Sequence, residues 1–177
     1  MAKVKWSLDP THAELQFKVK HLMISNVSGK ITKFDAAVET EDEDFTTAKV
    51  TLTAEVASIT TGNEQRDGHL QSADFFDSAK YPQIKFTATK YEKEGSDEYK
   101  VYGDLTIRDI TKPVKFDVEF GGITKDPWGH TRAGLTVEGK INRKEFGLTW
   151  HAVTEAGGLV VGDDVKLHAE LEFIKQA

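Results

Sequence analysis

Cysteine is absent from this sequence of 177 residues. Its absence excludes thiol catalysis, disulfide bonds and metal sites built on thiolates, and it leaves the redox compartment open. The N-terminal residues also lack the continuous apolar stretch of a secretory signal peptide, which predicts a cytoplasmic protein. A periplasmic protein from which a signal peptide has been removed is the alternative.

Charge of one sign is not concentrated in any segment. The formal net charge is -6, and lysine and arginine are scattered along the chain. Nucleic-acid-binding proteins neutralise phosphates with clustered basic side chains, so we do not expect a nucleic acid partner. The hydrophobic fraction of 38% and the charged fraction of 29% are typical of a folded globular protein without membrane-spanning segments. The length predicts one domain over residues 1–177.

Catalytic and metal-binding motifs are also missing. There is no Gly-x-Ser-x-Gly segment, and the carboxylates fall mainly on the polar side of alternating segments. The histidines lack the short spacing of metal ligands; they are His12, His21, His69, His130, His151 and His168. We therefore expect a protein that is not an enzyme, has no metal site and requires no cofactor.

What the sequence does contain is a repeated alternation of apolar and polar residues. On a pleated strand this alternation places the apolar side chains on one face and the polar ones on the other. The alternating runs predict about eight strands; they lie at 14–21, 29–39, 49–56, 84–88, 101–107, 114–120, 133–141 and 165–173.

The connections between these runs favour antiparallel neighbours. Short turns are predicted at 94–98, 111–113 and 125–130. Short helical segments are predicted near 22–26 and 63–77, the second of them within the one long connection, 58–82. The fold class is therefore all-β, and the short hairpins favour an eight-stranded up-and-down barrel over a sandwich of two sheets.

Two segments interrupt the alternation with polar and aromatic residues. In the first, 58–82, Phe75 and Phe76 either contact an apolar ligand at the rim or plug one end of the barrel. In the second, 141–147, Arg143 either contacts an anion or belongs to a bend held by hydrogen bonds. The sequence leaves both alternatives open.

A succession of short motifs carries further information. The motifs are Trp6-Ser-Leu-Asp-Pro-Thr-His12, Ser58-Ile-Thr-Thr61, Arg66-Asp67, His69-Leu70, Phe75-Phe76-Asp77, Tyr81-Pro82, Gly103-Asp-Leu-Thr-Ile-Arg108, Lys112-Pro-Val114, Ile141-Asn-Arg143 and Phe146-Gly147. In this order, over essentially the whole chain, they resemble the YceI-like, polyisoprenoid-binding family. The resemblance implies an extended, lipocalin-like barrel whose tunnel binds a long isoprenoid, such as an isoprenoid quinone or a polyprenyl phosphate, without catalysis.

The resemblance, with the inward faces of the runs, suggests residues for such a tunnel. The lining residues expected from it are Phe17, Val19, Phe34, Leu52, Phe75, Phe76, Phe86, Leu105, Ile107, Phe116, Leu135 and Val137. A buried phosphate or quinone oxygen needs hydrogen-bond donors. The candidates for the head group are His21, Arg66, His69, Arg108 and Arg143.

Two other functions remain as alternatives. The first is an enzyme acting on a hydrophobic substrate with His12, His21 or His69 as acid or base. The second is a stress-related scaffold, as a monomer or a homodimer, that acts through its outer surface and has a closed core.

Overall fold

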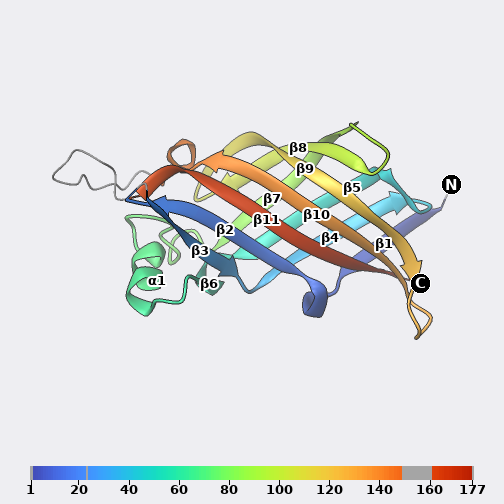
Figure 1. The fold of residues 1–177 in the computed structure, drawn as a ribbon, viewed down its shortest axis with the longest axis horizontal. Helices are drawn as coiled ribbons and strands as arrows, with labels where there is room; N and C mark the ends of the chain where they lie inside the picture. The colour runs from blue at the N-terminus through green and yellow to red at the C-terminus, as the bar shows by residue number, and fades with distance from the viewer. Residues whose placement is uncertain (1, 23, 149–160, 177) are drawn as a thin grey trace.

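A computed structural model of the chain describes residues 2–22, 24–148 and 161–176, and shows an elongated antiparallel β-barrel (Figure 1). Its strands and its one α-helix are β1 (Lys3–Leu8), β2 (Glu14–His21), β3 (Ser25–Ile31), β4 (Phe34–Glu41), β5 (Asp44–Glu55), β6 (Ile59–Thr60), α1 (Glu64–Gln71), β7 (Gln83–Lys93), β8 (Glu98–Ile107), β9 (Ile110–Lys125), β10 (Thr131–Asn142) and β11 (Val161–Lys175). Three 3-10 turns accompany them: η1 (Pro10–His12), η2 (Val56–Ser58) and η3 (Arg143–Phe146).

The barrel is closed because β1 pairs with β11 as well as with β4. The hydrogen-bonded order is β1-β4-β5-β7-β8-β9-β10-β11, and β11 also pairs with β2 along its N-terminal part. The pairs β1 and β2, β3 and β4, and β5 and β6 are therefore halves of interrupted strands. Counted in this way, eight strands form one closed up-and-down sheet, which confirms the predicted barrel and excludes the sandwich.

The interruption between β1 and β2 has a local cause at Asp9. Its side chain accepts hydrogen bonds from the Thr11 backbone N–H and hydroxyl, and Pro10 occupies the start of η1. Such a side-chain cap, together with the fixed φ of proline, favours a short turn over a continuing strand. The chain thus bends where the barrel passes from one half to the other.

Two predicted connections were wrong. Among the described residues 22 and 24–26 there is no helix, because Leu22 adopts a left-handed backbone conformation (φ 53°) and β3 begins at Ser25. The turn expected at 111–113 lies instead at Arg108 and Asp109, since Ile107 pairs directly with Ile110. Pro113 is tolerated within β9 because the described pairing of β9 with β10 stops at Asp117, so Pro113 has a strand partner on one side only.

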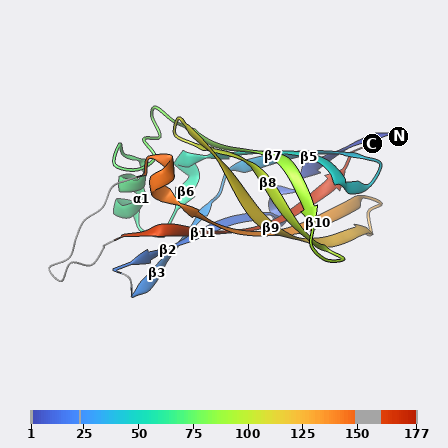
Figure 2. The ribbon, with the colours of Figure 1, turned by 90° about the horizontal axis from the view of Figure 1, so that it is seen from above.

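The long connection contains the predicted helix, although the helix is shorter than expected. Asn63 caps α1 by accepting a hydrogen bond from the Arg66 backbone N–H at 3.0 Å, and α1 ends at Gln71. Residues 72–77 form turns rather than helix. In Figures 1 and 2, α1 lies at one end of the barrel, and both chain termini lie at the other end.

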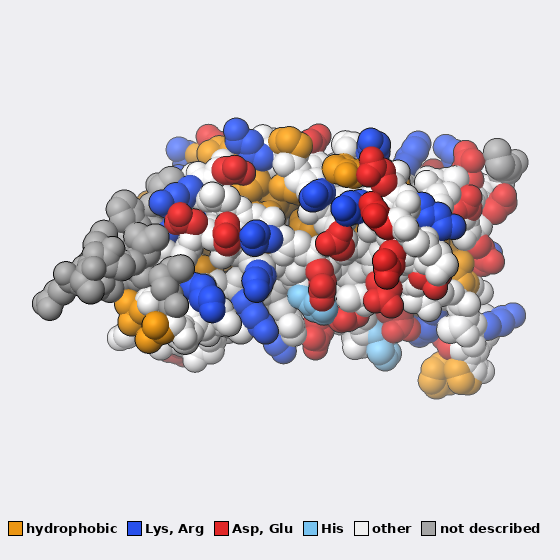
Figure 3. Space-filling view, turned by 45° about the horizontal axis from the view of Figure 1, so that its top comes forward, with side chains coloured by type: hydrophobic (Ala, Val, Ile, Leu, Met, Phe, Trp, Pro, Cys, Tyr) orange, Lys and Arg blue, Asp and Glu red, His pale blue; other side chains and the backbone are white. Residues whose placement is uncertain are grey.

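The outer face follows the alternation of the sequence. Charged side chains of both signs are interspersed over the strands in Figure 3, with hydrophobic side chains in the minority. The apolar side chains form two clusters inside the barrel. One cluster includes Ile31, Phe75 and Phe146 at the α1 end, and the other includes Trp6 and Phe173 at the end with the termini.

Candidate binding site in the barrel interior

The interior of the barrel is not completely filled. A cavity of about 310 Å³, here called the α1 chamber, lies beside α1. A second cavity of about 160 Å³, here called the far chamber, lies toward the chain termini. The larger volume is at the lower limit of small-molecule pockets, and the smaller one is comparable to cavities that hold a benzene ring.

The predicted lining residues divide between the two chambers. The α1 chamber is lined by Phe17, Val19, Phe75, Phe76, Leu105 and Ile107, and the far chamber by Leu52, Phe86, Leu105, Phe116, Leu135 and Val137. Phe34 lines neither chamber and instead packs against both hydrophobic clusters. The alternation had placed Phe34 on the inner face, but it could not show that neighbouring side chains cover its ring.

Some lining residues were not selected from the sequence. Leu15 and Leu167 belong to the alternating runs and could have been chosen by the same criterion. Tyr91 and Tyr99 lie beyond the predicted runs, because β7 and β8 are longer than the alternation suggested. The Tyr91 hydroxyl is buried without a hydrogen-bond partner among the described residues, and burial raises its pKa to about 12.

Polar side chains meet at the α1 end of the interior. His21, Arg66, His69 and Arg143 all line the α1 chamber, together with Thr61. Arg66 donates from Nε to the Thr61 hydroxyl at 2.7 Å and from Nη2 to the Thr61 carbonyl at 2.9 Å. His69 Nε2 lies 2.8 Å from a carboxylate oxygen of Asp74. Four of the five predicted head-group residues therefore lie at one end of the barrel.

Arg143 has a structural role that the sequence had offered as an alternative. The residue is only 2% exposed, and its side chain donates from Nε to the Gly162 carbonyl at 2.8 Å and from Nη1 to the Leu148 carbonyl at 2.6 Å. Nη2 of Arg143 also lies 3.8 Å from a carboxylate oxygen of Asp163. Burial lowers the pKa of the Arg143 guanidinium. Arg143 thus holds η3 against the start of β11 beneath the α1 chamber.

Arg108 lies apart from the other predicted head-group residues. It does not contribute to the described lining of either chamber. Its Nη1 donates to the Gly147 carbonyl at 2.9 Å, and its guanidinium lies 5.3 Å from the centre of the Tyr81 ring. Arg108 lies in the turn between β8 and β9, where strand alternation does not determine the direction of a side chain, and its role at the head group stays a prediction.

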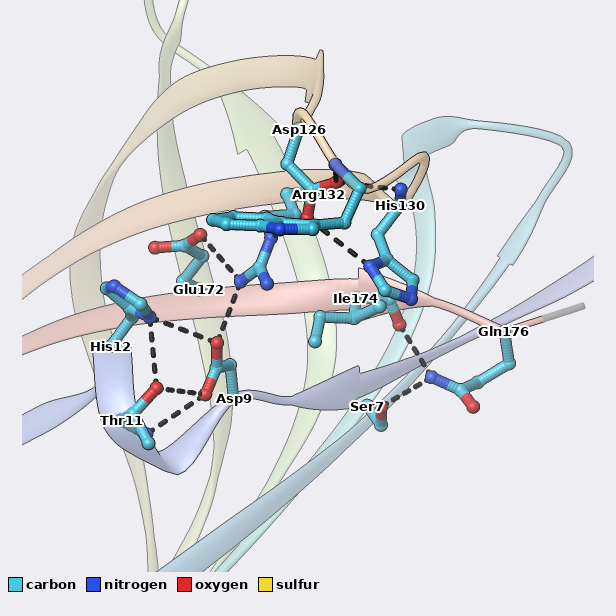
Figure 4. Close-up of polar contacts among 11 residues, drawn as sticks. Ser7, Asp9, Thr11, His12, Asp126, His130, Arg132, Glu172, Ile174 and Gln176 are labelled. Carbon is cyan, nitrogen blue, oxygen red and sulfur yellow. Dashed lines mark hydrogen bonds and ion pairs between the residues drawn. The ribbon is translucent and has the colours of Figure 1, made fainter.

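His12 is also distant from the α1 chamber. In Figure 4 it lies with Asp9 and Arg132 near the termini, and its Nδ1 is 3.0 Å from an Asp9 carboxylate oxygen. Of the three histidines offered as acid or base, His21 and His69 line the α1 chamber, whereas His12 does not. Within the described ranges, no group of three or more His, Cys, Asp or Glu side chains could hold a metal ion. No helix in these ranges is long and apolar enough to cross a membrane.

Comparison with known structures supports the fold assignment. The Campylobacter jejuni YCEI protein is 35% identical, with a TM-score of 0.77 over 89% of this chain and 90% of its own. BcnA of Burkholderia cenocepacia shares the fold at 22% identity (TM-score 0.80; 93% and 98% of the two chains). A polyisoprenoid-binding domain from Saccharophagus degradans also shares the fold, at 15% identity and a TM-score of 0.72, over 97% of this chain and 98% of its own.

Sequence comparison assigns the family. The UPF0312 protein SA2479 of Staphylococcus aureus strain N315 is 44% identical over 169 residues, which cover 95% of this chain and 96% of that protein. The profile of the YceI-like domain matches residues 6–173. With the closed barrel and the order of its motifs, these matches show that the chain belongs to the YceI-like family.

Proposed function

We propose that this protein binds a long-chain isoprenoid, such as an isoprenoid quinone or a polyprenyl phosphate, inside the barrel, without catalysing a reaction. The observation that carries the proposal is the pair of apolar chambers in one closed barrel, with polar side chains gathered at the α1 end. The family membership and the fold shared with a polyisoprenoid-binding domain support it.

The chemistry of the interior suits such a ligand. Burial of apolar surface contributes roughly 25 cal/mol per Å², so a tail held by unspecific apolar contacts can be bound tightly. The head group needs donors, because a buried phosphate or carbonyl oxygen without hydrogen bonds is costly. Arg66, His69 and His21 would supply these donors, and Arg143 would add positive charge to the α1 chamber. The bound isoprenoid would be cargo rather than a cofactor.

Two earlier alternatives receive less support. A scaffold acting only through its surface has no need of the two apolar cavities in the interior. For an enzyme, the histidines offered as acid or base that line the α1 chamber are His21 and His69, and the contacts described for His69 are to Asp74 and Phe75 rather than to a nucleophile. Location in the cytoplasm and assembly as a homodimer stay predictions.

The proposal can be tested on the purified protein. Organic extraction followed by mass spectrometry should recover an isoprenoid, and the emptied protein should bind added quinone and polyprenyl phosphate. Arg66→Gln should weaken polyprenyl phosphate more than the uncharged quinone, whereas the outward-facing control Lys85→Gln should change neither. If extraction repeatedly yields no isoprenoid and neither ligand binds, the proposal is wrong.

A further inference from the structure

The two chambers adjoin at a group of apolar side chains, here called the waist. Leu105 and Leu167 line both chambers. Phe86 and Phe116 reach the waist from the far chamber, with their ring centres 5.3 Å apart, and Phe17 reaches it from the α1 chamber. These residues come from five different strands, β2, β7, β8, β9 and β11, so the waist is built from one continuous side of the barrel apart from β10.

The register of the sheet explains how the waist is built. Gly139, Leu167, Phe17 and Gly29 are successive partners across β10, β11, β2 and β3. The row therefore has a glycine at each end and two large side chains, Leu167 and Phe17, between them. Such pairing of an aromatic ring with a cross-strand glycine is a recognised device of curved sheets.

Each of the three phenylalanines lies against a glycine. A Cβ atom added to Gly29 would lie 2.3 Å from Cζ of Phe17, and one added to Gly139 would lie 2.2 Å from Cδ1 of Phe116. A Cβ on Gly103 would lie 2.5 Å from Cζ of Phe86. Only glycine leaves room for these rings at the wall, so each ring packs directly against the backbone of a neighbouring strand.

The volumes show why the waist matters for a long ligand. A cavity of about 160 Å³ or about 310 Å³ holds a short apolar group, but a long tail needs both. To fill both chambers, the tail must pass the waist, where Phe17 lines the α1 side and Phe86 and Phe116 line the far side. A phenylalanine side chain has two rotatable bonds, so each ring can change its orientation. The glycine beside each ring has no side chain that would block this movement.

We propose that Phe17, Phe86 and Phe116 form a gate that selects apolar tails by length. A short tail occupies the α1 chamber alone, with the gate in the arrangement described above. A long tail displaces the rings along the wall and continues into the far chamber. This inference rests on the proposed function, because it assigns a length limit to the same binding site.

The test compares two uncharged isoprenoid alcohols, farnesol with a short tail and solanesol with a long one. Both should bind the wild-type protein in a calorimetric or fluorescence titration. Gly29→Ala and Gly139→Ala should push a ring toward the axis and weaken solanesol binding roughly tenfold or more, with little effect on farnesol. Gly134→Ala is the matched control on the strand of Gly139, because a Cβ there meets nothing within 4 Å.

A further variant keeps the test valid if Gly29→Ala and Gly139→Ala fold poorly. Phe116→Ala removes one ring and should strengthen solanesol binding relative to farnesol. The gate is rejected if the two alcohols change in parallel in these variants, if neither changes, or if the wild-type protein binds farnesol alone. If the wild-type protein binds neither alcohol and no isoprenoid quinone or phosphate, the proposed function fails together with the gate.

Discussion

At the scale of single residues, the hydroxyl of Tyr91 is a polar group in an otherwise apolar chamber. The Tyr91 hydroxyl lies in the far chamber without a hydrogen-bond partner among the described side chains and backbone. Desolvation raises its pKa to about 12, so the hydroxyl stays protonated at neutral pH. A buried polar group that forms no hydrogen bond lowers the stability of the fold.

Replacing Tyr91 by phenylalanine should therefore not destabilise the protein. We expect the free energy of unfolding of Tyr91→Phe, measured by urea denaturation, to be unchanged or higher by up to about 1 kcal/mol. Tyr102→Phe serves as a control, because the Tyr102 hydroxyl donates to Glu92 at 3.1 Å and its removal should not raise stability. A clear loss of stability in Tyr91→Phe would show that the hydroxyl is bonded in solution.

At the scale of elements, one arginine joins three parts of the barrel near the termini. Arg132, at the start of β10, contacts Asp9 before η1 at 2.7 Å, Asp126 in the β9–β10 turn at 2.7 Å and Glu172 in β11 at 3.0 Å (Figure 4). The hydrogen bond from Arg132 is the main cause that lowers the pKa of Asp126 from 3.8 to about 2. Hydrogen bonds from Thr11 and then from Arg132 hold the pKa of Asp9 still lower.

This network predicts a contribution to stability that depends on pH. Both carboxyl pKa values are lower in the folded state, so the contribution is fully present above pH 3.8 and is lost as the pH falls through the folded values, about 2 for Asp126. Arg132→Ala should lower the melting temperature at neutral pH. The difference in melting temperature between this variant and the wild type, here called the gap, should become smaller in acid.

Thermal denaturation monitored by circular dichroism at a series of pH values would measure this gap. Lys140→Ala is a suitable control, because Lys140 pairs with Asp164 at 3.7 Å on the exposed surface. Exposed ion pairs contribute little, so this variant should melt like the wild type. A gap between Arg132→Ala and the wild type that stays constant down to pH 2 would contradict the assignment.

At the scale of the whole molecule, ligand binding and barrel stability should be coupled. The interior walls come from strands at both ends of the chain, so a ligand that fills both chambers binds only the closed barrel. Such a ligand at about 100 times its Kd adds about 2.7 kcal/mol to the free energy of unfolding. For a protein of this size, that corresponds to a rise in melting temperature of roughly 5–10 °C.

Scanning calorimetry with two quinones of the same head group would check this coupling. The quinone with a long isoprenoid tail should raise the melting temperature, whereas the head group without a tail, at the same concentration, should have little effect. An equal shift for both compounds would mean that the tail does not enter the barrel, and that binding is confined to the α1 end.

Several features were predictable because they depend on local geometry. In a strand, successive side chains point to opposite faces, so the alternation predicted the inner faces and most of the chamber lining, including Phe17, Phe86 and Phe116. Turns were harder to predict. The turn at Leu22 lacks glycine, and Pro113 resembles a turn residue although it lies in a strand.

The sequence by itself therefore determined the strands, the direction of their side chains and the closed barrel as the favoured way to bury them. Only the tertiary structure decided that Arg108 and Phe34 lie away from the chambers and that glycines stand opposite the phenylalanines of the waist. It also decided that the interior is divided in two. The position of each glycine against a phenylalanine depends on the register between neighbouring strands, and periodicity within one strand contains no information about register. Arg108 lies in a turn, where strand alternation does not determine the direction of a side chain.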